Sequence, residues 1–183
     1  MARDFQYDIM PEIKARWSPR AFSSDPVTRE ELMALIEAAR YAPSCFNEQP
    51  WRFLIADDDV RLEKMRRVLT DSNREWAGKA PVLILVLSVK VFADKGSENR
   101  WHLFDAGTAW GFLSLEAQRR RLITHAMGGF SARRAREEFD IPEELDVITV
   151  IAVGHPGDLD GLSPANRALE FPQSRKAAEE LLI

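Results

Sequence analysis

Two arginines four positions apart stand near the N-terminus, in the run Arg16-Trp17-Ser18-Pro19-Arg20. A guanidinium group is a fixed fork of N–H donors that suits phosphate and carboxylate oxygens, and a serine hydroxyl offers a further hydrogen bond. Arg16, Ser18 and Arg20 can therefore converge on one anion. Because surface arginines usually bind nothing, the alternative is a solvated helix or turn.

A second polar cluster lies in a loop bounded by prolines, residues 43–50, where Ser44, Asn47 and Gln49 precede Trp51. The amides can donate and accept hydrogen bonds at the edge of a planar heterocycle, while apolar residues of the same loop cover its face. The alternative is a rigid turn whose amides bond only to the backbone and whose Trp51 fills the core. The residues alone leave both open.

Several other chemistries find no support in the residue pattern. The phosphate-loop, dinucleotide-binding and hydrolase-elbow motifs are all missing from the sequence. His102, His125 and His155 are far from one another and from Cys45 along the chain, so no metal-ligand spacing exists and we expect no metal. A Cys–His nucleophile pair, whose members would meet only in space, stays open.

The composition describes one globular domain. The chain has 183 residues, 45% of them hydrophobic, and a net charge of −4, which gives no general attraction to nucleic acid. Its apolar stretches at 81–89 and 101–117 are shorter than the roughly 20 residues that span a bilayer. One cysteine and an acidic N-terminus without a signal peptide predict a cytoplasmic protein that binds neither nucleic acid nor membrane.

Hydrophobic spacing and capping residues predict the elements that position these clusters. We expect helices over 28–41, 58–70, 100–122, 131–140 and 176–182, and strands over 51–56, 82–87 and 147–153. The continuous apolar run 82–87 indicates a strand covered on both faces, in the middle of the sheet. No repeat or composition break divides the chain, so we predict one α+β domain over 1–183.

Two segments suggest contact with a partner. Apolar residues surround most of the helix at 100–122, with Gly107 and Gly111 on one side, so we expect this helix to be buried on all sides, either within the chain or at an interface. The tail at 158–176 has too few core residues to fold alone. The tail either packs against its own chain or wraps around a partner chain.

The order and spacing of these motifs resemble the FMN-dependent nitroreductase family. The resemblance rests on the Arg-x-Ser-x-Arg-x-Phe run at 16–22 and on Ala-Pro-Ser-x-x-Asn-x-Gln-Pro-Trp-Arg-Phe at 42–53. Later features agree and extend it over nearly the whole chain: Asn73, Asp105-Ala-Gly, Met127-Gly-Gly-Phe130, Ile141-Pro-Glu-Glu-Leu145, Val153-Gly-His-Pro156 and Arg175-Lys176.

The resemblance implies a nitroreductase-like α+β fold, with a central mixed, mostly antiparallel sheet flanked by helices, in an intertwined homodimer with FMN at the subunit interface. Arg16, Ser18, Arg20 and Arg175 would hold the FMN phosphate and ribityl chain. The family often has two basic residues in its C-terminal phosphate clamp, whereas Gln173 occupies one candidate position here.

The resemblance also assigns the ring end of the cofactor. Residues of the 43–47 loop would line the isoalloxazine, in the partner's site. Asn73 would meet the pyrimidine end, and Gly128 and Gly129 would lie over the ring. The full predicted cofactor-binding set is Arg16, Trp17, Ser18, Arg20, Pro43, Ser44, Cys45, Asn47, Gln49, Asn73, Gly128, Gly129 and Arg175.

The implied function is an oxidoreductase that passes hydride from NADH or NADPH through FMN to a small flat acceptor, such as a nitroaromatic, quinone or enone. The flavin carries the chemistry, so no catalytic side chain is expected. A chain this short leaves little room for an inserted lid, which favours an open site over dehalogenation of an iodinated tyrosine or fragmentation of flavin. The alternatives are a non-catalytic FMN-binding or storage dimer, and an interaction module whose arginines form salt bridges.

Overall fold

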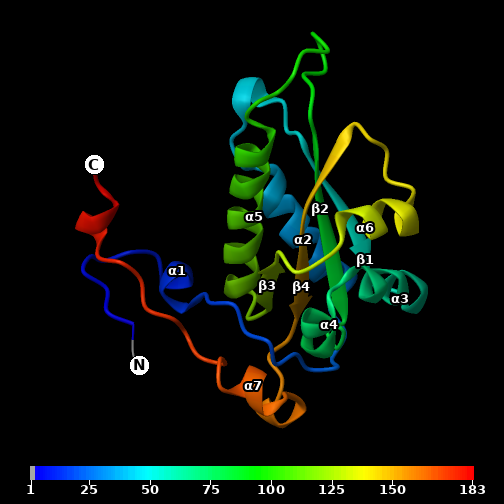
Figure 1. Ribbon diagram of the computed structural model, residues 1–183. Helices are drawn as coiled ribbons and strands as arrows, with labels where there is room; N and C mark the ends of the chain where they lie inside the picture. Colours follow the sequence, from blue (N-terminus) through cyan, green and yellow to red (C-terminus); the bar gives the residue numbers. More distant parts are fainter. Residues whose placement is uncertain (1–2) are drawn as a thin grey trace.

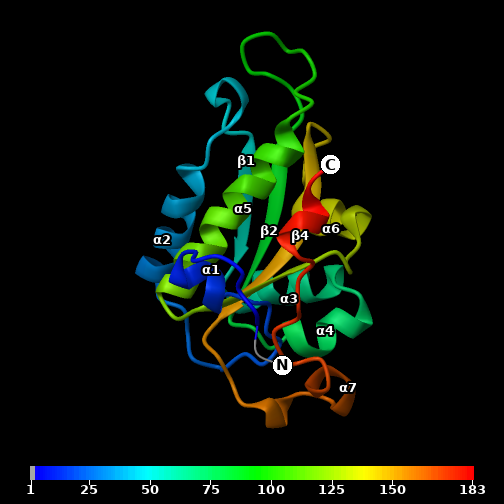
Figure 2. The same ribbon diagram turned by 90° about the vertical axis from the view of Figure 1, so that its left-hand side faces the viewer.

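The computed structural model describes residues 3–183, so positions 1–2 of the predicted domain lie outside the described residues. A four-stranded sheet stands between two groups of helices (Figures 1 and 2). The elements follow in the order α1 (Pro11–Ala15), α2 (Arg29–Arg40), β1 (Trp51–Ala56), α3 (Asp59–Val68), α4 (Asp71–Ala77), β2 (Val82–Val89), α5 (His102–Arg119), β3 (Ile123–Met127), α6 (Ala132–Phe139), β4 (Leu145–Gly154) and α7 (Pro164–Arg167).

The strand order is β1-β2-β4-β3, and every described pairing is antiparallel. Trp51 faces Ser88 across β1 and β2, and Val82 faces Val153 across β2 and β4. The mostly antiparallel sheet is therefore confirmed, while the parallel component of the expected mixed sheet is not found within residues 3–183.

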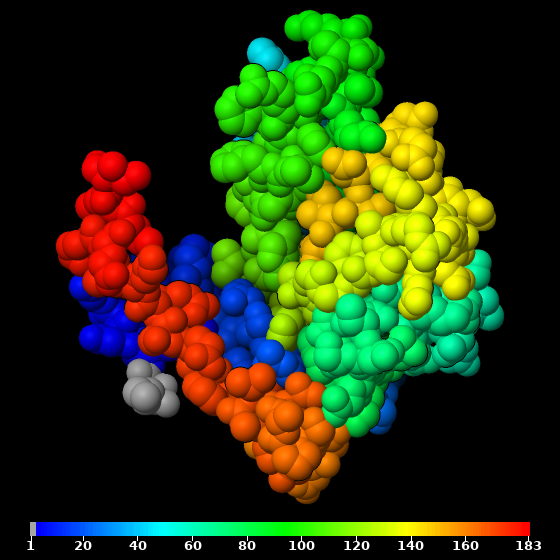
Figure 3. All heavy atoms as spheres, in the orientation of Figure 1, coloured from blue at the N-terminus to red at the C-terminus, as the bar shows by residue number. Residues whose placement is uncertain are grey.

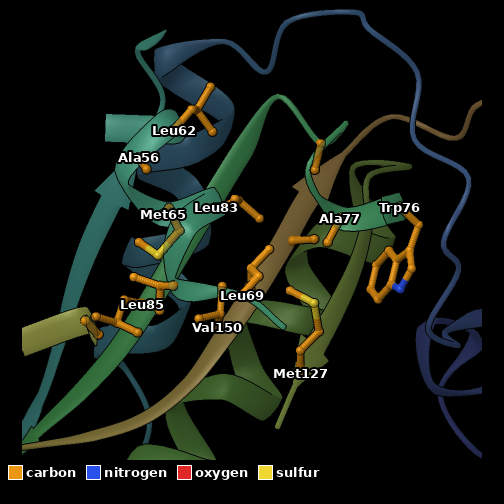
Figure 4. Close-up of a cluster of buried hydrophobic side chains, with 14 of the residues drawn as sticks. Ala56, Leu62, Met65, Leu69, Trp76, Ala77, Leu83, Leu85, Met127 and Val150 are labelled. Atoms are coloured by element: carbon orange, nitrogen blue, oxygen red, sulfur yellow. The ribbon is translucent and has the colours of Figure 1, made fainter. Parts of the chain in front are cut away.

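Strand β2 has the central, doubly covered position that its continuous apolar run predicts. Leu83 and Leu85 point to one face, where they pack with residues of α3, α4 and α6 (Figure 4). Val82 and Ile84 point to the other face, toward α2 and α5. Successive side chains of a strand alternate between faces, so one apolar strand serves two cores.

The predicted helix starts are confirmed where a capping side chain precedes the apolar run. Thr28 forms a capping box with Glu31 at the start of α2, and the side chains of Asp58 and Ser131 accept backbone N–H groups at the starts of α3 and α6. These caps satisfy N–H groups that have no partner inside the helix.

Other expectations need correction. Strand β3 and helix α4 were not predicted, and the predicted final helix is a short 3₁₀ turn over Ala178–Leu181. Helix α5 ends at Arg119, and its own chain does not bury it on all sides: Leu103 and Phe104 are 51% and 73% exposed. Residues 3–183 leave that side of α5 uncovered.

Both chain ends form arms that stand away from the body. Figure 3 shows a deep cleft between the C-terminal arm and α5. The arms lie side by side, because the Ala178 N–H donates to Gln6 Oε1 at 3.0 Å. Within residues 3–183, no helix is long and apolar enough to cross a membrane.

Candidate functional site

Two arginines of the predicted set meet between the N-terminal arm and the C-terminal tail. Arg16 and Arg175 line one groove with a volume of about 640 Å³, together with Gln173. Arg16 is half-buried, and its Nη1 atom donates to the Trp17 carbonyl at 3.1 Å and lies 3.5 Å from Ser18 Oγ. The groove thus brings together segments almost 160 positions apart in the sequence.

The arginines of this groove are not paired with carboxylates of residues 3–183. Burial lowers the pKa of Arg16, and the nearby guanidinium groups of Arg3 and Arg175 lower it further. Among residues 3–183, no carboxylate forms an ion pair with any of these arginines or with Arg20. The salt bridges expected of a mere interaction module are therefore not formed, and the groove favours an anion.

Arg20 lies apart from the lining of this groove. Its guanidinium group stacks over the Trp76 ring, 5.6 Å from the centroid, and its backbone N–H donates to the Glu170 carboxylate at 2.8 Å. Glu170 also accepts the N–H of Ala21 at 3.0 Å. Glu170 therefore ties the C-terminal tail, which carries Arg175, to the end of the arginine motif.

His125, on β3, contacts the backbone of the arginine motif at residues 16–20. Its Nδ1 atom lies 3.0 Å from the Pro19 carbonyl oxygen, which can only accept, so Nδ1 carries the proton. The imidazole packs against Trp76 with ring centroids 4.5 Å apart. Burial lowers the pKa of His125 to about 4, and the positive charges of Arg20 and Arg16 contribute. A neutral histidine thus holds the backbone of the motif.

The second cluster forms a strained loop built around a 3₁₀ turn, Cys45–Asn47. Phe46, Asn47 and Gln49 have φ values of 52°, 58° and 49°, a left-handed conformation that is uncommon for residues other than glycine. Such strain persists only where surrounding contacts impose it, and it is common at binding sites. Pro43 in this loop is exposed.

The loop's hydrogen bonds separate its polar side chains into two kinds. Ser44 Oγ accepts the Gln49 N–H at 3.0 Å, and Gln49 Nε2 donates to the Asn47 carbonyl at 3.0 Å. These two side chains stabilise the loop itself. The Asn47 amide is exposed and has no hydrogen-bond partner within the described chain. Trp51 is buried in the core, as the structural alternative predicts.

Asp105, which was not predicted as a site residue, anchors this loop to α5. It is 2% exposed, and its carboxylate accepts the Cys45 N–H at 3.1 Å. Cys45 is half-buried with a free thiol. A carboxylate among the apolar residues in the first part of this helix was the available signal.

Asn73 and Gly129 come together, as the prediction requires, but through contacts within the chain. Asn73 Nδ2 donates to the Gly129 carbonyl at 3.0 Å, and a Cβ atom at position 129 would lie 2.5 Å from that nitrogen. A side chain at position 129 would therefore require the Asn73 amide to move. Gly128 is exposed, with open space where a Cβ would lie.

The two clusters lie near opposite ends of α5. Asp105, in the first turn of α5, accepts a hydrogen bond from the loop. Helix α1, which immediately precedes Arg16, packs near the last turn of α5 (Figure 1). Hydrogen bonding to Glu116 raises the pKa of Arg119 in that last turn, and Glu12 of α1 is near enough to contribute. The helix has 18 residues and is about 27 Å long.

Comparisons with known proteins agree with this architecture. A model of the nitroreductase family matches residues 13–74 and 65–155. A solved oxidoreductase containing FMN is 33% identical and superposes with a TM-score of 0.94, covering 99% of this chain and 93% of that one.

Two curated relatives bear named activities. An iodotyrosine deiodinase of Thermotoga neapolitana is 28% identical over 89% of this chain and 95% of its own length. An FMN reductase (NAD(P)H) of Bacillus subtilis is 22% identical over 86% of this chain and 69% of its own length. The fold, the motifs and these matches lead to one assignment: the chain belongs to the nitroreductase family.

Proposed function

We propose that this protein is an FMN-dependent oxidoreductase that passes hydride from NADH or NADPH to a small flat acceptor. The observation that carries the proposal is the groove lined by both Arg16 and Arg175, with which no carboxylate of residues 3–183 forms an ion pair. A phosphate group fits this donor set, because guanidinium forks and phosphate oxygens form charge-assisted hydrogen bonds.

We assign the phosphate and ribityl chain of FMN to Arg16, Ser18, Arg20 and Arg175. We assign the isoalloxazine ring to Pro43, Ser44, Cys45 and Asn47. Asn73 would meet the pyrimidine edge of the ring, and Gly128 and Gly129 would lie over its face. Trp17 and Gln49 complete the proposed cofactor-binding set. The free amide of Asn47 is the side chain best placed to bind the ring directly. Ser44 and Gln49 act by holding the loop in its strained form.

We further propose that each site is shared between two chains. Within one chain the arginines and the loop lie near opposite ends of α5, a helix about 27 Å long. A second copy of the chain would bring its loop to the arginines of the first. The exposed side chains of α5 and the outstretched arms supply an apolar surface for such a homodimer.

When bound, FMN supplies the hydride chemistry, accepting hydride from a reduced nicotinamide and donating it to an acceptor. The chain's own groups bind and orient. The arginines neutralise the phosphate, His125 holds the motif backbone while neutral, and Asp105 fixes the loop. No side chain is assigned a proton transfer.

Nitroaromatics, quinones and enones are the acceptors we propose. Chain length does not separate these from iodinated tyrosines, because the deiodinase of T. neapolitana is matched over 95% of its length. The argument from a short chain against dehalogenation is therefore weaker than expected. The cytoplasm as location, and the single domain over 1–183, stay predictions.

Flavin analysis of the purified protein tests the proposal. We expect one FMN per chain, released on denaturation, in protein that is yellow or becomes yellow after incubation with FMN. A cooperatively folded protein that stays colourless would contradict the proposal. A flavin-loaded protein that neither NADH nor NADPH reduces would instead be the non-catalytic FMN-binding or storage dimer.

A further inference from the structure

Arg3 has guanidinium donors that the chain itself does not satisfy. This residue lies in the arm before α1, and its Nη1 atom donates to the carbonyl oxygens of Arg16 at 2.7 Å and Lys14 at 3.3 Å. Its Nε and Nη2 atoms are shielded from solvent, and residues 3–183 offer them no hydrogen-bond acceptor. Leaving a charged donor buried without an acceptor costs folding free energy. The arrangement therefore favours binding of a ligand whose oxygen atoms accept from Arg3.

The neighbours of Arg3 are also positively charged. Arg3, Arg16 and Arg175 line the same groove, and burial together with the charge of Arg175 lowers the pKa of Arg3. Asp4 lines this groove as well, yet it forms no ion pair with the three arginines. Three guanidinium groups without a counterion suit a ligand that carries more than one negative charge.

We propose that Arg3 is the third guanidinium, beside Arg16 and Arg175, of a site for a phosphomonoester dianion. Such a group has several oxygens, enough to accept from the unpaired Nε and Nη2 atoms of Arg3 as well as from the other two arginines. The inference rests on the proposed function, in which two phosphomonoesters occur. One is the 5′-phosphate of FMN and the other is the 2′-phosphate of NADPH.

The first arm of the test compares FMN with riboflavin, which lacks the phosphate. Arg3→Gln should raise the Kd of FMN about tenfold and leave the Kd of riboflavin unchanged, because only the phosphate contact is lost. Arg29→Gln removes a charge from the start of α2 and should change neither constant. Arg3→Lys keeps the charge without the fork and should recover part of the FMN affinity.

The second arm compares the two nicotinamides. If the 2′-phosphate of NADPH occupies the site, Arg3→Gln should lower kcat/KM for NADPH about tenfold relative to NADH, while the FMN affinity stays that of the native protein. This outcome supports the phosphomonoester site, assigns it to the electron donor and removes Arg16 and Arg175 from the proposed contacts to the FMN phosphate.

A third arm needs no flavin, so it separates this inference from the proposed function. Inorganic phosphate should raise the melting temperature of the apoprotein above that in chloride of equal ionic strength, and Arg3→Gln should remove the difference. The structural alternative is that Arg3 only caps the carboxyl end of α1. Equal weakening of FMN and riboflavin, with the NADPH preference and the phosphate effect unchanged, would establish that alternative and overturn the proposal.

Discussion

His125 shows how one side chain links the fold to the candidate anion site. Its neutral ring donates to the Pro19 carbonyl and packs on Trp76, whose ring also carries the Arg20 guanidinium. A proton on this imidazole would be partly buried and would face Arg20 and Arg16. The motif therefore requires the neutral form.

This requirement predicts a pH dependence of stability. The pKa of His125 is about 4 in the folded chain, below its ordinary value of 6.5, so between these values the unfolded chain binds a proton that the folded chain does not. The free energy of unfolding should fall as the pH drops through this window, by up to about 3 kcal/mol from this group. Urea unfolding of the apoprotein at pH 7 and pH 4.5 measures it.

His125→Gln is the control for this prediction, because glutamine keeps an N–H donor for Pro19 but does not titrate. Carboxylates contribute to the acid sensitivity of both proteins, so the difference between them isolates the histidine. Equal loss of stability on acidification in the two proteins would refute the role given to His125.

Asn47 supports a prediction about the cofactor, since its amide is exposed and unpaired within the described chain. Asn47→Gly removes the amide but keeps a residue that tolerates the left-handed φ of 58°, and it should leave the melting temperature within a degree or two. It should weaken FMN or slow one half-reaction. Stopped-flow measurement of flavin reduction and reoxidation separates the two effects, and native FMN affinity with native rates would remove Asn47 from the site.

At the scale of the elements, the anchoring of the 43–49 loop to α5 predicts the effect of Asp105 variants. Asp105→Ala leaves the Cys45 N–H without its acceptor and should lower the free energy of unfolding by about 1–3 kcal/mol. Asp105→Asn keeps an oxygen acceptor and should lose less.

Chymotrypsin cleavage after the exposed Phe46 reports on the same contact. The alanine variant should be cut faster than the native protein, with the asparagine variant between them. Similar cleavage rates in all three proteins would show that other contacts hold the loop.

The elements that the sequence predicts are those with a local signal. Thr28, Asp58 and Ser131 mark helix starts, and the apolar run of β2 marks a central strand. Helix α4 is missed because Asp71–Ala77 is short and polar, and its one large apolar residue, Trp76, is buried through tertiary contacts.

In the candidate site, too, the sequence predicts the residues that have a local signal and misses the others. The two motifs are visible because their residues are close in sequence. Arg3, Asp105 and Glu170 lie outside both motifs, and each acts on a backbone or charge distant from it along the chain. Only tertiary structure reveals that Arg20 stacks on Trp76 while Arg16 and Arg175 face the groove.

At the scale of the whole molecule, the exposed side of α5 and the two arms predict an obligate homodimer. Sedimentation equilibrium at low protein concentration should give twice the chain mass. A stable flavin-loaded monomer would contradict both the dimer and the shared site.

Mixed dimers test the shared site itself. An Arg16→Gln chain paired with an Asn47→Gly chain should contain one site with both changes and one with neither, so FMN binding should recover at half of the sites. If each chain builds its own site, no site in the mixed dimer is native and no recovery should occur.

Anaerobic titration of the FMN-loaded protein with NADH and with NADPH, followed by addition of a quinone or nitroaromatic, tests the central claim most directly. We predict that about one equivalent of at least one nicotinamide per flavin bleaches the visible flavin absorbance, and that the acceptor restores it. A bound flavin that keeps its absorbance in excess NADH and NADPH would contradict the assignment of this protein as a flavin oxidoreductase.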